Sequence, residues 1–156
     1  MIIYLLRHGD ALQNYESDKM RPLSENGIKD VKKIGSFLES KKFNIQKIFS
    51  SPLFRAYQTA ELIGKIIGFQ DEIEELDILL PEANLDDLLN FLLKNDYVSV
   101  LLVSHQPLIG NIISKLISSR TVQVEVKKSS LACIEIKQPI NTGDGVLKFL
   151  INSELI

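Results

Sequence analysis

The amino-acid sequence predicts an α/β fold of three layers, in which a mostly parallel central sheet lies between helices. Two observations support this prediction. Apolar runs at residues 2–6 and 98–103 are typical of strands that are buried on both faces. Segments with apolar residues at spacings of three and four, the pattern of an amphipathic helix, alternate with such strands along the chain. This alternation favours a parallel sheet that is covered on both sides.

The first half of the chain contains two strand–helix units. After the first strand and a polar loop, Ser24 is suited to cap a helix that continues through Leu38, because its hydroxyl can accept a hydrogen bond from a first-turn amide. Residues 47–50 form a second short strand. Pro52 opens the next helix and Gly68 ends it, since glycine readily adopts the left-handed conformation found after helices.

The second half continues this alternation and then changes to a hairpin. We expect a short strand at 73–76, a helix at 85–93, a strand at 98–103, a helix from Pro107 through Ile117, and a β-hairpin made of residues 130–136 and 146–151. No internal repeat or linker interrupts the 156 residues, so we expect a single domain over residues 1–156.

Composition and charge exclude several classes of function. The formal net charge of -2 gives no general attraction to nucleic acid or to an anionic membrane. The chain has no run of the about 20 apolar residues that a membrane span needs, and its first residues lack the pattern of a signal peptide. The single cysteine, Cys133, excludes an internal disulfide and fits a reducing compartment. We therefore expect a cytoplasmic protein.

Polar residues cluster directly after the predicted strands, where such a sheet places its ligand. The chain has only two histidines, His8 and His105, and both follow apolar strands. Lysine supplies most of the basic residues, yet Arg7, Arg21 and Arg55 lie in these loops or in the long loop after Gly9. A lone histidine at a strand end is more often structural, but two histidines and two arginines converging at strand ends favour a site.

These residue types suit the transfer of a phosphoryl group. Its charge is spread over three oxygens, so the protein must supply fixed donors and an in-line nucleophile. Arginine can hold two of the oxygens at once, and a neutral histidine with one free ring nitrogen is a nucleophile near pH 7. Neither histidine has a cysteine or carboxylate at ligand spacing, and no glycine-rich lysine loop is present, so we expect neither a metal nor a cofactor.

Three segments, in the same order, resemble the histidine phosphatase superfamily with its phosphoglycerate-mutase-like fold. They are LLRHGDA at 5–11, SSPLFRAYQTAE at 50–61 and VLLVSHQPLIG at 100–110. The short chain and the segment SDKMRPLSENG after the first motif most resemble the SixA-type phosphohistidine phosphatases. The resemblance implies that His8 is the phosphorylated residue and that Arg7, Arg55 and His105 complete the phosphate pocket.

The resemblance implies less about three further residues. Arg21, in the RPL segment, is either an additional phosphate or substrate contact or the partner of Asp18 in a surface ion pair. Gln106 contributes at most its backbone amide. Glu82 occupies about the place of the carboxylate that protonates an alkoxide leaving group in many members, while Asp86 suits a capping role at a helix start.

The substrate follows from the leaving group and from the length of the chain. An alkoxide needs a proton donor, whereas an imidazole that leaves phosphohistidine needs less help. Between Ala56 and Val103 we expect only a helix, a short strand and another helix, with no helical lid over the pocket. The sequence therefore predicts removal of phosphate from phosphohistidine on a phosphotransfer signalling protein. The alternatives are a phosphomonoesterase of small metabolites and, more remotely, a non-catalytic domain that binds phosphorylated partners.

Overall fold

The computed structural model describes residues 1–156, and its six strands form one sheet in the order β3-β2-β4-β1-β5-β6. The strands are β1 (Ile2–Arg7), β2 (Lys47–Ser50), β3 (Glu74–Glu75), β4 (Ser99–Ser104), β5 (Ser130–Glu135) and β6 (Val146–Asn152). The pairings β1–β4, β2–β4 and β2–β3 are parallel, while β1–β5 and β5–β6 are antiparallel. The prediction of a mostly parallel sheet is confirmed.

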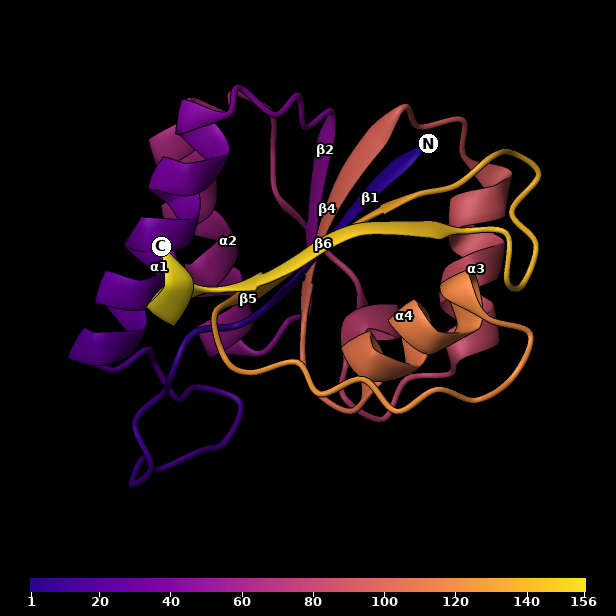
Figure 1. Ribbon diagram of the computed structural model, residues 1–156. Helices are drawn as coiled ribbons and strands as arrows, with labels where there is room; N and C mark the ends of the chain where they lie inside the picture. Colours follow the sequence, from indigo (N-terminus) through magenta and orange to yellow (C-terminus); the bar gives the residue numbers. More distant parts are fainter.

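Helices cover both faces of the sheet (Figure 1). The helices α1 (Glu25–Ser40) and α2 (Phe54–Ile67) pack together on one face, and α3 (Leu85–Lys94) and α4 (Leu108–Ile117) lie on the other. Each face has its own apolar core, and every residue of β4 is buried between the two. The three-layer α/β architecture is therefore confirmed. No helix is long and apolar enough to cross a membrane.

The predicted helix signals act as expected. The Ser24 hydroxyl accepts a hydrogen bond from the amide of Gly27 at 3.1 Å and so satisfies a first-turn donor of α1. Gly68 follows α2 with φ of 69°, in the left-handed region that favours glycine.

Some boundaries differ from the prediction by one to a few residues. The helix α2 begins at Phe54 rather than Pro52, because the Ser51 hydroxyl accepts a hydrogen bond from the Leu53 amide and holds a turn first. The third strand has only two residues and is followed by a 3₁₀ turn, η1 (Asp77–Leu79). The hairpin strands β5 and β6 pair as predicted, and ten residues connect them.

The sheet topology brings three loops together at one edge. In the register, Arg7 at the end of β1 pairs with Ser104 at the end of β4, and Ser50 at the end of β2 pairs with Val103. The ladder continues past the strands, because the amide of His8 donates to the Ser104 carbonyl at 3.1 Å. The carboxyl ends of adjacent parallel strands are where open α/β sheets bind their ligands.

Candidate active site

The two histidines lie against each other at this edge of the sheet. Their ring centroids are 4.8 Å apart, and the planes are tilted by 56°. His8 is 7% exposed and His105 is 2% exposed, so both imidazoles are largely shielded from water. The sequence separation of 97 residues is closed by the β1–β4 pairing, which places both residues directly after neighbouring parallel strands.

The contacts of His8 determine which ring nitrogen is free. Its Nδ1 lies 2.6 Å from the Gly9 carbonyl oxygen, which can only accept a hydrogen bond, so Nδ1 carries the hydrogen. The lone pair is then on Nε2. Burial, together with the positive charges of Arg55 and Arg7, lowers the pKa of His8 to about 3 against the favourable Gly9 contact. The imidazole is therefore neutral at physiological pH.

The His8 loop is held from α2. The Gly9 amide donates to the Thr59 hydroxyl at 3.2 Å, and that hydroxyl donates to the Arg55 carbonyl at 2.7 Å. Thr59 is fully buried, so this chain of hydrogen bonds fixes the backbone beside His8.

His105 is oriented by Ser51, a fully buried residue after β2. The Ser51 hydroxyl lies 2.8 Å from His105 Nε2 and also accepts a hydrogen bond from the Leu53 amide at 3.3 Å. Because the Ser51 hydroxyl accepts from the Leu53 amide and donates to no other group of the protein, we assign its hydrogen to His105 Nε2 and the imidazole hydrogen to Nδ1. Burial and the neighbouring His8 and arginines lower the pKa of His105. The neutral ring thus presents an N–H donor.

Arg7 and Arg55 enter the site from the end of β1 and the first turn of α2. Arg7 Nη1 donates to the Val126 carbonyl at 2.8 Å, and Arg55 Nη1 donates to the Asp18 carbonyl at 2.9 Å. Burial lowers the pKa of both guanidinium groups, which remain charged because the ordinary pKa of arginine lies far above physiological pH.

Three buried donor atoms at the site have neither a hydrogen-bond partner nor an ion pair in the protein. They are Nε of Arg7, Nε of Arg55 and Nδ1 of His105. A buried donor without a partner costs about 1–3 kcal/mol, more when it is charged, so three of them within one site are costly unless an acceptor satisfies them. An oxyanion with several acceptor oxygens meets this requirement.

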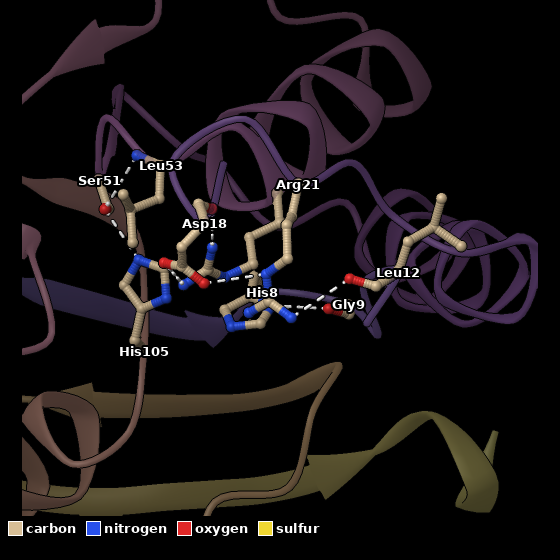
Figure 2. A network of polar contacts seen from close by, with 9 residues as sticks. His8, Gly9, Leu12, Asp18, Arg21, Ser51, Leu53 and His105 are labelled. Carbon is tan, nitrogen blue, oxygen red and sulfur yellow. Dashed lines mark hydrogen bonds and ion pairs between the residues drawn. The ribbon is translucent and has the colours of Figure 1, made fainter. Parts of the chain in front are cut away.

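Arg21 lies in the loop between β1 and α1. Its Nε forms an ion pair with Asp18 Oδ1 at 2.9 Å, and its Nη1 donates to the Leu12 carbonyl at 3.2 Å. The ion pair with Asp18 is thus present, and Asp18 also pairs with Arg55 through Oδ2 at 3.3 Å. Figure 2 shows this network beside His8 and His105. Arg21 therefore joins the site through a carboxylate that it shares with Arg55.

Glu82 lies in an exposed turn between η1 and α3, and its side chain makes no hydrogen bond or ion pair. Asn84 caps α3 by accepting from the Asp86 amide at 2.8 Å, which leaves Asp86 in the first turn of the helix. The role of Glu82 as an acid remains a prediction.

Sequence reasoning did not predict the side-chain contacts of four residues that shape the site. Ser51 and Thr59 lie within the SSPLFRAYQTAE segment, so the motif itself contained the signal. The Gln106 side chain accepts from the Gly110 amide at 2.8 Å and donates to the Val124 carbonyl at 3.0 Å, which attaches the chain preceding β5 to the start of α4. Asp18 was considered only as a partner of Arg21.

The structure groups no three His, Cys, Asp or Glu side chains that could hold a metal ion. The arrangement instead offers a free imidazole nitrogen, fixed N–H donors and charged guanidinium groups. Such a set can bind a tetrahedral oxyanion and attack its central atom.

A family model, sequence relatives and solved structures all indicate the same family. Residues 3–88 match the family model described as the histidine phosphatase superfamily (branch 1). The phosphohistidine phosphatase SixA of Escherichia coli (strain K12) is 34% identical over 124 residues, which is 78% of this chain and 77% of that protein. The SixA homolog of Haemophilus influenzae is 30% identical over 130 residues, 77% of this chain and 79% of that protein.

Among solved structures, the protein histidine phosphatase SixA complexed with tungstate superposes with a TM-score of 0.91 at 27% identity, covering 99% of both chains. The matched segment contains the loops after β1 and β2, and the structural match extends to the loop after β4. On the family model, the SixA relatives and the shared fold together, the chain belongs to the histidine phosphatase superfamily.

Proposed function

We propose that this protein is a phosphohistidine phosphatase that transfers the phosphoryl group first to His8 and then to water. The observation that carries the proposal is the set of three buried, unpartnered donors beside a neutral imidazole whose Nε2 is free. The relative SixA from E. coli is named for this activity, and the solved SixA structure holds tungstate, a tetrahedral oxyanion like phosphate.

In the first step, His8 Nε2 attacks the phosphorus atom, and the bond from phosphorus to the leaving nitrogen breaks. The nucleophile needs no base because the Gly9 carbonyl already holds the Nδ1 hydrogen. Arg7 and Arg55 neutralise the charge that spreads over the equatorial oxygens, and Nδ1 of His105 donates to one of them. The anion in turn raises the pKa of His105, so the ring can add positive charge as the transition state forms.

In the second step, water attacks phosphorylated His8 and releases inorganic phosphate. The bond between phosphorus and Nε2 breaks, its electron pair returns to the ring, and His8 is neutral again once the water has lost its proton to solvent or to phosphate. The same fixed donors serve both steps, because the phosphoryl group keeps its equatorial oxygens in place while it is transferred.

We infer that the substrate is a phosphohistidine carried by a phosphotransfer protein. Between Ala56 and Val103 the only helical segments are α2, η1 and α3, and the short β3 and most of β4 make up the strands, so no further helix could serve as a lid. Removal of a phosphoryl group from such a partner would damp a phosphorelay in the cytoplasm, a location that the single buried Cys133 favours. The reaction calls for no cofactor, and the small negative charge favours neither nucleic acid nor membrane as partner.

The proposal is tested by assaying the protein against a phosphorylated phosphotransfer domain and a panel of phosphomonoesters. We expect a higher kcat/KM on phosphohistidine and, after acid-free quenching, a phosphoenzyme that base stabilises and acid cleaves, as for a phosphorus–nitrogen bond. His8→Ala removes the covalent route and should reduce turnover by about 1,000-fold or more. Substantial activity in His8→Ala, or turnover of phosphomonoesters alone, would overturn the proposal.

A further inference from the structure

Asp18 lies in the loop after β1, and its side chain contacts an arginine of the site. Its carboxylate pairs with Arg55 Nη2 at 3.3 Å through one oxygen and with Arg21 Nε at 2.9 Å through the other. Its backbone carbonyl also accepts from Arg55 Nη1 at 2.9 Å. Figure 2 shows the carboxylate held between these contacts, beside the two histidines. Asp18 is therefore fixed in position by these three contacts, two of its carboxylate and one of its backbone carbonyl.

The carboxylate lies on the solvent side of the arginine that binds it. The Asp18 side chain is 67% exposed, whereas that of Arg55 is only 6% exposed. His8 is on the buried side, and its Nε2 must attack opposite the leaving group. A substrate enters from solvent, so its leaving group points outward, toward the exposed side on which Asp18 lies.

We propose that Asp18 recognises the leaving imidazole of phosphohistidine and activates it. This inference rests on the function proposed above. The ring of phosphohistidine has one nitrogen bonded to phosphorus and a second nitrogen that can carry a hydrogen. The Asp18 carboxylate accepts a hydrogen bond from this second nitrogen and stabilises the protonated, positively charged ring.

The protonated ring is the better leaving group. When His8 Nε2 bonds to phosphorus, the electron pair of the breaking bond returns to the leaving nitrogen. The ring keeps the hydrogen on its second nitrogen and departs as neutral imidazole, so the step balances without any proton donor. An unprotonated ring would have to leave as an anion. Asp18 thus takes over the task for which an alkoxide would need an acid such as Glu82.

The same carboxylate disfavours phosphomonoesters. The Asp18 carboxylate, which pairs with two arginines, repels an alkoxide that develops negative charge beside it. Asp18 therefore selects for a leaving group that is cationic before the bond breaks and neutral after it.

The test compares two substrates in the wild type and in Asp18→Asn. Phosphohistidine on a protein, or its analogue phosphoimidazole, depends on the proposed contact, whereas the nitrophenolate that leaves p-nitrophenyl phosphate has no N–H for Asp18 to accept and gains nothing from the carboxylate. Loss of the arginine pairing lowers kcat/KM for both substrates and cancels in their ratio. The ratio of the two kcat/KM values therefore reports the effect of Asp18 on the leaving group. We expect a loss on the order of 30-fold for phosphohistidine beyond any loss for p-nitrophenyl phosphate, the effect of one charged hydrogen bond.

The pH profile gives a second readout that a purely structural role would not move. With phosphoimidazole, kcat should decline at high pH as the bound ring loses its proton, and in Asp18→Asn this decline should begin at lower pH. The profile with p-nitrophenyl phosphate should not shift. Asp71→Asn is the matched control. It removes a surface carboxylate that pairs with Lys47 at 3.6 Å and lies away from the site, so kcat/KM should stay unchanged for both substrates.

Three outcomes would overturn the inference. Equal losses on both substrates would make Asp18 a support for the arginines only. Faster turnover of both, with stronger inhibition by inorganic phosphate, would mean that the carboxylate competes with the phosphoryl group. An unshifted pH profile would show that Asp18 does not stabilise the protonated ring of the substrate. Thermal unfolding of Asp18→Asn and Asp18→Ala checks the fold, and a wild type inactive on phosphohistidine would refute the proposed function instead.

Discussion

The hydrogen bond between Ser51 and His105 offers a sharp test of how the site is built. Ser51→Ala removes the hydroxyl that lies 2.8 Å from His105 Nε2, in a place where Ser51 is 0% and His105 2% exposed. Alanine offers only a methyl group at this position, and the surroundings are closed to water. His105 Nε2 therefore stays buried without a hydrogen-bond partner. That loss costs about 1–3 kcal/mol.

The cost should appear in both activity and stability. The hydroxyl selects the ring form with the hydrogen on Nδ1, the atom proposed to donate to phosphate. If this form of the ring loses about 2 kcal/mol of its stabilisation, kcat/KM falls about 30-fold, because each 1.36 kcal/mol changes a rate tenfold. The same loss lowers the melting temperature by about 4–8 °C for a chain of this size.

Ser50→Ala is the matched control for this prediction. Ser50 is also fully buried, but its hydroxyl donates to the Ser51 carbonyl at 2.9 Å and touches neither histidine. It should lose stability of similar size while kcat/KM on phosphohistidine stays within about threefold of the wild type. Equal kcat/KM in the two variants would refute the idea that the Ser51 hydroxyl orients His105. Nitrogen chemical shifts of the His105 ring report the tautomer directly.

Three further predictions concern the remaining site residues. Arg55→Ala should lose about 3 kcal/mol or more of transition-state stabilisation, measured as kcat/KM on either substrate, and unchanged kinetics would argue against the pocket. Glu82→Gln should affect phosphomonoester hydrolysis more than phosphohistidine hydrolysis if the carboxyl is an acid, and equal effects would remove that role. Because the pKa of His8 is lowered to about 3 from an unfolded value of about 6.5, the unfolded chain binds the extra proton between these values, so the free energy of unfolding falls as the pH drops below 6.5. By pH 5 this contribution is about 2 kcal/mol, and urea titrations should show a correspondingly smaller decline for His8→Ala.

Much of the fold could be predicted because its signals are local. The buried strands at 2–6 and 98–103 are unbroken apolar runs, and the caps at Ser24 and Gly68 follow from the chemistry of single residues. The extent of β3 could not be predicted, since a two-residue edge strand forms only because β2 is already in place beside it. The start of α2 likewise depends on a contact of the Ser51 side chain.

The candidate site divides in the same way. Four residues, Arg7, His8, Arg55 and His105, could be predicted because the motifs that contain them directly follow strands or open a helix. Their proximity depends on the β1–β4 register, which pairs positions about 97 residues apart. Periodicity along the chain does not encode which strand lies beside which.

The sequence by itself determined the residue types, their order and the strand ends at which they lie, because these depend on neighbours along the chain. Only the tertiary structure decided which nitrogen of each imidazole is free, that Asp18 bridges two arginines, and that Glu82 lies in an exposed turn. Hydrogen bonds and ion pairs act over a few ångströms, so they are set by atoms that meet through folding rather than by spacing in the sequence.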